Sequence, residues 1–172
     1  MRGQFLKVIE AIQQRTHEEA VRGPTLSGRK GELQYLVELL SDALTAESVC
    51  ENECRRLARI AHSRQIEWLA QSLDAHAEVE RKIVERLGRR IRELGGLPPI
   101  CSPEAEQIAS HDNDPLADLL DEELEVERIA VKTCCEIAER IADVDPEARQ
   151  TVEDALDCER SHLTQLTKLT HP

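Results

Sequence analysis

Apolar residues recur every three or four positions along most of this chain, the spacing that places side chains on one face of an α-helix. The longest series covers residues 32–61, and a second covers residues 66–94. Two further series follow at residues 116–141 and 148–166, and a shorter amphipathic segment, residues 4–20, precedes them all. The pattern therefore predicts four long helices and a short N-terminal one.

Glycine and proline mark where these helices end. Gly95-Gly96 and Pro98-Pro99 close the second long series, and a connection over residues 95–113 follows. Asp114-Pro115 and Asp145-Pro146 are typical of an N-cap followed by a first-turn proline. Short connections within each pair make the paired helices antiparallel, and the long one lets the second and third helices run parallel. We expect a four-helix bundle over residues 32–172, preceded by an extension and linker, residues 1–31.

Composition narrows the fold class and the cellular setting. The 172 residues include one Phe, one Tyr, one Trp and six Cys, so the core must be aliphatic. That argues against β-sandwiches and barrels, and against stacking platforms for single-stranded nucleic acid. No apolar run approaches the roughly 18 residues of a membrane span, and no secretory-type stretch opens the chain. We expect a cytoplasmic protein without membrane association, whose cysteines are thiols or ligands.

Charge gives little reason to expect nucleic acid as a partner. The net charge is −12, while residues 1–31 carry six basic and three acidic side chains, a balance of +3. The remainder is therefore −15. A modestly basic tail on a strongly acidic body is a weak indication of phosphate contacts.

Four glutamates interrupt the apolar stripes of the four long helices. Glu47 and Glu80 are 33 residues apart, and Glu127 and Glu159 are 32 apart, so antiparallel pairing brings all four to one level. His162 follows Glu159 by three residues. A di-iron carboxylate site uses one Glu from each of two helices and a Glu-x-x-His from each of the other two. The second helix has Glu80 but carries Ile83 at the histidine position.

Several segments resemble the bacterioferritin and Dps-like branch of the ferritin-like superfamily. The first, LSDALTAESVC at residues 40–50, is similar to that branch's first metal-ligand helix. RELGGLP at 92–98, ELEVERIA at 123–130 and LDCERSH at 156–162 resemble the second, third and fourth helices. The resemblance implies an all-α, ferritin-like bundle and a homo-oligomer, either a dimer or a cage. It also implies a protein that binds Fe(II), oxidises it with O₂ or peroxide, and stores it.

The resemblance implies one or two non-haem iron ions as cofactor, with metal ligands Glu47, Glu80, Glu127, Glu159 and His162. Departures from the pattern leave ferroxidase activity open, since Ile83 replaces one histidine. The aromatic positions of the first and third helices carry Cys54 and Cys134. Haem is not expected, because the haem-binding methionine position corresponds to Arg81.

Accessory candidates lie on or near the inward stripe: His76, Cys50, Cys54, Cys134 and Cys158. Each has a plain interpretation, a small apolar thiol in the core or a half-buried histidine that supports a ligand. The sharper interpretation is a thiol-containing pocket for a softer metal such as zinc or copper(I). Three functions stay open: iron oxidation and storage at a degenerate site, a non-catalytic structural or assembly role, and binding of another metal.

Overall fold

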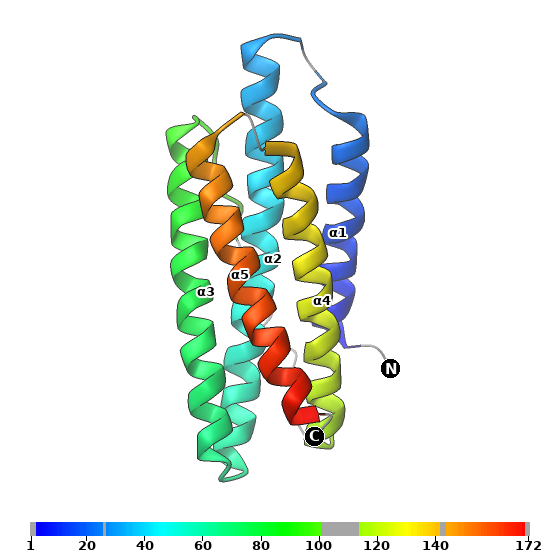
Figure 1. Ribbon diagram of the computed structural model, residues 1–172, viewed down its shortest axis with the longest axis vertical. Helices are drawn as coiled ribbons and strands as arrows, with labels where there is room; N and C mark the ends of the chain where they lie inside the picture. The colour runs from blue at the N-terminus through cyan, green and yellow to red at the C-terminus, as the bar shows by residue number, and fades with distance from the viewer. Residues whose placement is uncertain (1–2, 26, 101–113, 142–143, 171–172) are drawn as a thin grey trace.

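The chain folds into five helices, and the described residues contain no strand. The computed structural model describes residues 3–25, 27–100, 114–141 and 144–170 (Figure 1). The predicted all-α class is confirmed. In chain order the helices are α1 (Gln4–Arg22), α2 (Arg29–Ser63), α3 (Glu67–Glu93), α4 (Leu116–Ile141) and α5 (Pro146–Thr170).

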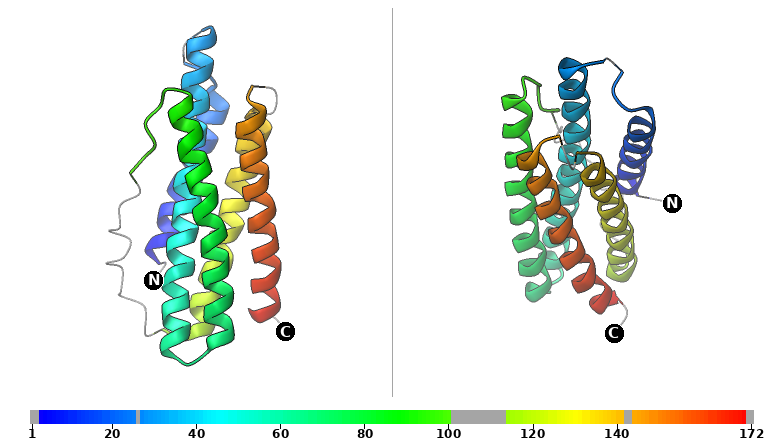
Figure 2. Two further views of the ribbon diagram at one scale, coloured as in Figure 1. Left: turned by 90° about the vertical axis from the view of Figure 1, so that its left-hand side faces the viewer. Right: turned by 45° about the horizontal axis from the view of Figure 1, so that its top comes forward.

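Helices α2 to α5 form the bundle as two antiparallel hairpins, α2–α3 and α4–α5. Helices α3 and α4 start at the same end of the bundle and run in the same direction, as predicted (Figures 1 and 2). Residues 101–113 of the predicted long connection lie outside the described part. Helix α2 packs on α3 and α4, and α5 packs on α4 and α3.

Local signals explain the helix ends. The carboxylate of Asp145 accepts a hydrogen bond from the backbone N–H of Ala148 at 2.9 Å, so the predicted N-cap of α5 is confirmed. Arg90 of α3 also binds Asp145, at 2.6 Å, which ties the two hairpins together at this end. The turn between α2 and α3 is closed by Gln65, whose φ of 61° lies in the left-handed region.

Two apolar clusters fill the bundle, one on each side of its middle. The upper cluster joins the start of α2 to the end of α3, the end of α4 and the start of α5, and includes Leu40, Leu87, Ile91, Ile137 and Val152. The lower cluster surrounds the α2–α3 turn and includes Leu57, Leu69, Leu73, Leu119, Leu124 and Leu166. The aliphatic core expected from the composition is thus divided in two, with a polar layer between.

Helix α1 covers the groove between α2 and α4 (Figure 1). Phe5, Ile9 and Ile12 are buried there in a third cluster with Cys50 of α2. Thr16 donates a hydrogen bond to Asp42 at 2.8 Å, and Arg15 pairs with the same carboxylate. One face of the bundle is therefore closed by the N-terminal helix. The division of the chain at residue 31 stays a prediction.

The single tryptophan, Trp68, lies in the first turn of α3 and is 58% exposed. None of the described helices combines the length and the apolarity that a membrane-spanning segment needs.

Candidate metal centre

The polar layer between the two apolar clusters contains five fully buried glutamates. Each bundle helix contributes at least one, and every one of these side chains is 0% exposed: Glu47 from α2, Glu80 from α3, Glu123 and Glu127 from α4, and Glu159 from α5. Two nearly buried histidines lie with them, His76 from α3 and His162 from α5. The near-equal spacing within the hairpins places these side chains at one height.

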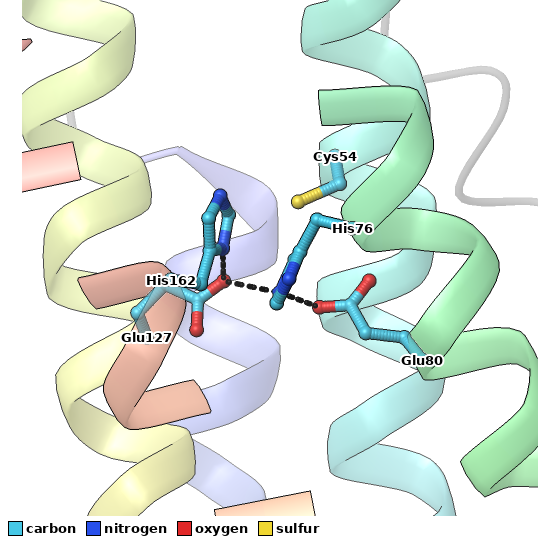
Figure 3. A group of neighbouring side chains, drawn as sticks. All are labelled: Cys54, His76, Glu80, Glu127 and His162. Carbon is cyan, nitrogen blue, oxygen red and sulfur yellow. Dashed lines mark hydrogen bonds and ion pairs between the residues drawn. The ribbon is translucent and has the colours of Figure 1, made fainter. Parts of the chain in front are cut away.

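Five of these inward side chains form a tight group, drawn in Figure 3. Nδ1 of His162 lies 2.8 Å from Oε1 of Glu127. Nε2 of His76 lies 3.8 Å from that oxygen and 2.9 Å from Oε1 of Glu80, without the alignment of a hydrogen bond. The two imidazole rings stack with centroids 3.5 Å apart. With the thiol of Cys54, one donor atom from each residue lies within 4.8 Å of all the others.

A second group shares two carboxylates with the first. It contains Cys50, Glu80, Glu127 and Glu159, again with one donor atom each within 4.8 Å of the others. Glu80, Glu127, Glu159 and His162, four of the five predicted ligands, therefore lie in one group or the other. Their role as ligands stays a prediction.

Glu47, the fifth predicted ligand, is buried in the same layer but belongs to neither group. One of its oxygens accepts a hydrogen bond from the thiol of Cys134 at 3.4 Å. Ile83, at the position where a second Glu-x-x-His would place its histidine, is 3% exposed and packs in the upper cluster. This side of the layer therefore offers no ring nitrogen.

The layer has far more acceptors than donors. Among the described residues, eight of its buried polar atoms have no hydrogen-bond partner, including both oxygens of Glu80 and both of Glu159. Arg56 is the one buried lysine or arginine of the described part, and it binds Glu53 at 2.7 Å. Buried polar groups without partners are costly, so this arrangement favours a bound cation.

Burial controls protonation in the layer. It raises the pKa of Glu47 to about 7, and it raises the pKa values of Glu80, Glu123, Glu127 and Glu159 well above their usual range, helped by the neighbouring carboxylates. Burial also lowers the pKa of His76 to about 4 and that of His162 to about 2. Both shifts favour the uncharged forms, which are the protonated carboxyl group and the neutral imidazole that binds metals.

Three cysteines near the layer, Cys50, Cys54 and Cys134, are buried thiols, and Cys54 and Cys134 donate hydrogen bonds to glutamates. Burial, together with nearby carboxylates, raises the pKa values of Cys50, Cys54 and Cys134 well above the usual range, so they are poor nucleophiles. Cys54 donates to Oε1 of Glu123 at 3.1 Å. The half-buried Cys158 lies with Sγ 3.7 Å from Nδ1 of His76. These contacts orient the polar side chains of the layer.

Sequence reasoning missed Glu123 and gave His76 only an accessory place. Glu123 precedes Glu127 by four residues, and His76 precedes Glu80 by four, so each pair shares a helix face. The i, i+4 offset from a predicted ligand was the sequence feature that could have identified both residues. It is common on charged helices, however, and marks a site only where packing turns that face inward.

Comparisons with known proteins agree with this architecture. A search of curated proteins gives no match. A family model described as a ferritin-like domain matches residues 37–171, which include all four bundle helices nearly complete and every glutamate of the polar layer. The chain therefore belongs to the family of ferritin-like domains.

Proposed function

We propose that this protein binds iron inside its helical bundle, at the buried layer of carboxylates and histidines. The observation that carries the proposal is the surplus of unpartnered acceptors: eight buried atoms of the layer have no hydrogen-bond partner among the described residues. A divalent cation would satisfy these atoms and take the place of the protons that burial favours on the carboxyl groups.

The donor set suits iron as substrate or cargo. Carboxylate oxygens together with imidazole nitrogens favour iron and manganese over softer ions. Glu80, Glu127, Glu159 and His162 would hold the ion, with Glu47 close enough in the layer to join them. Bound Fe(II) would lose one electron to dioxygen or peroxide supplied from solution. The glutamates would release their protons as the ion enters.

Binding is the primary activity in this proposal, and oxidation and storage follow from it. Ile83 leaves the layer one imidazole short of the pattern of two Glu-x-x-His pairs. We propose that the chain acts as a homo-oligomer, as its family membership suggests. The cytoplasmic location stays a prediction, as does the absence of a nucleic-acid partner.

A second candidate function is binding of zinc or another borderline ion. Cys54 favours it, because its thiol belongs to the same donor group as both histidines. Thiolate and imidazole are the usual zinc ligands. The third function considered above, a purely structural role, predicts that the folded protein binds no metal.

Anaerobic titration of metal-free protein with Fe(II), followed by exposure to air, tests the proposal. The informative variant is Glu127→Gln, which keeps the side-chain shape and removes the charge. Glu125→Gln is the matched control, because Glu125 lies on the same helix, is exposed and pairs with Arg128. We expect Fe(II) binding in wild type and control, and affinity weaker by about 100-fold in Glu127→Gln.

Ferric absorbance after air exposure would extend the result from binding to oxidation. A folded wild-type protein that binds no Fe(II) would overturn the proposal. Preferential binding of Zn(II) in competition would favour the second candidate.

A further inference from the structure

We propose that the first ion enters the layer at its histidine end, where His76 supplies the nitrogen that Ile83 cannot. The donor set we assign to this ion is His76, His162, Glu80, Glu127 and Cys54. This inference rests on the proposed function, since it requires that the layer binds a cation. It differs from the proposed function in placing the ion away from Glu47 and in predicting one tight metal site per chain.

His76 is aimed into the layer. It is 9% exposed, and Nε2 has no hydrogen-bond partner among the described residues. That nitrogen lies 2.9 Å from Oε1 of Glu80, a carboxylate whose two oxygens are also unpartnered (Figure 3). The ring nitrogen and the carboxylate oxygens are close together but not hydrogen-bonded to each other. This is the arrangement expected of two ligands that share one ion.

The other histidine, His162, approaches the same carboxylates from the opposite hairpin. Nδ1 of His162 lies 2.8 Å from Oε1 of Glu127, and Nε2 of His76 lies 3.8 Å from that oxygen. Donors that each bind one ion at about 2.1 Å lie about 3.0–3.4 Å from one another in octahedral or tetrahedral sites. The separations between these histidines and glutamates are 2.8, 2.9 and 3.8 Å, close to that range, and one donor atom from each of the five residues lies within 4.8 Å of the others.

Contacts behind the donors hold two of them in place. Nδ1 of His76 faces Sγ of Cys158 at 3.7 Å, which leaves Nε2 to point inward. The thiol of Cys54 donates to Glu123 at 3.1 Å. A histidine whose other ring nitrogen is held in this way keeps its orientation before the ion arrives, whereas Cys54 is held through the thiol itself, whose proton the ion would replace.

The opposite side of the layer is less suited to an ion. Glu47 is partly satisfied by the thiol of Cys134, and Ile83 presents an apolar surface. An ion there would have carboxylates without an imidazole. Imidazole suits iron, zinc and copper, whereas carboxylates without it suit harder ions such as magnesium and calcium. The histidine end should therefore fill first.

Titration of metal-free protein with Co(II), followed by calorimetry and absorbance, tests the assignment. We expect one tightly bound Co(II) per chain. His76→Ala should weaken binding by about 100-fold or more, since even changes behind a ligand lower affinity about 10- to 100-fold. The matched control is His62→Ala, because His62 is exposed at the end of α2. Glu47→Gln should weaken binding much less than His76→Ala does, because Glu47 lies outside both donor groups.

Absorbance tests the thiol separately. The wild-type complex should show a thiolate-to-cobalt charge-transfer band that is lost in Cys54→Ser and kept in Cys134→Ser. Circular dichroism checks that each variant is folded, and His76→Gln replaces His76→Ala if the alanine variant is not.

The outcomes separate this inference from the proposed function. Wild-type protein that binds neither Co(II) nor Fe(II) overturns both. Tight binding that survives in the His76 variants, or that falls as much in Glu47→Gln, overturns the inference and leaves the proposed function standing. A wild-type complex without a thiolate band removes Cys54 from the donor set and overturns the assignment as stated.

Discussion

The two hairpins of the bundle reach the same polar layer by different means. In α4–α5, Glu127, Glu159 and His162 enter the layer from the positions that the Glu-x-x-His pattern specifies. In α2–α3, the residue three places after Glu80 is Ile83, which packs in the upper cluster, and the histidine is four places before Glu80. Positions three after and four before a helical residue lie on nearly the same face. A bundle can therefore exchange one for the other while its backbone stays the same.

The strongest way to test this difference is to restore the missing histidine with Ile83→His. We expect the metal-free protein to lose about 3 kcal/mol of its free energy of unfolding, because an imidazole replaces a well-packed aliphatic side chain. We also expect Co(II) stoichiometry to rise from one to two per chain. Urea denaturation with chelator present measures the first effect, and calorimetry measures the second.

The matched control for that variant is Val79→His. Val79 lies on the same helix and is 43% exposed, so it is not part of the buried layer. It should not add a second ion. Unchanged stoichiometry in Ile83→His would show that the hairpins differ in more than this residue.

The next effect is a dependence of stability on pH, which arises in both hairpins. A carboxyl group whose pKa is higher in the folded chain than its ordinary value of 4.5 stabilises the fold fully below that value. It loses this contribution as pH rises through the folded pKa. The histidines have lowered pKa values, so their contribution is complete above about pH 7. Above pH 7 the dependence then comes from groups with raised pKa values, chiefly the carboxyl groups of the layer, joined by the buried thiols above about pH 8.

We therefore expect the free energy of unfolding of metal-free protein to fall as pH rises above 7, by about 1.36 kcal/mol per pH unit for each proton that the layer retains there. Glu80→Gln and Glu159→Gln, one in each hairpin, should both reduce the slope. Urea denaturation at several pH values measures it. A flat or rising curve would contradict the protonated state inferred for the layer.

The smallest effect concerns the support of His76 from the opposite hairpin. Cys158→Ala removes the thiol beside Nδ1 of His76, and we expect Co(II) affinity to fall about tenfold, the lower end for a contact behind a ligand. Cys135→Ala is the control, since Cys135 contacts Arg160 at 3.5 Å. Equal affinities in both variants would show that His76 needs no such support.

The helices and their pairing could be predicted from the sequence because they depend on local signals. The apolar spacing, the paired glycines and prolines and the cap at Asp145 each act over a few residues. The matched spacing of Glu47 with Glu80, and of Glu127 with Glu159, similarly determines a common height once the hairpins are antiparallel.

The set of side chains that face the site could not be predicted, because it depends on the rotation of each helix about its own axis. Helical spacing allows His76 to face either the interior or the solvent, and only packing against α5 decides between them. The same holds for Glu123, whose inward position is settled by the thiol of Cys54 across the bundle. Glu47 fits the predicted spacing, yet it bonds with Cys134 outside both donor groups.

The position of Trp68 has a practical consequence for measuring this protein. It is the one strongly fluorescent side chain, and it is largely exposed in the first turn of α3, beside the α2–α3 turn and away from the polar layer. Its emission should follow the loss of helix packing at that end and change little when an ion binds at mid-bundle. Fluorescence and metal-dependent absorbance therefore provide two independent signals, so folding and occupancy can be followed together in one sample.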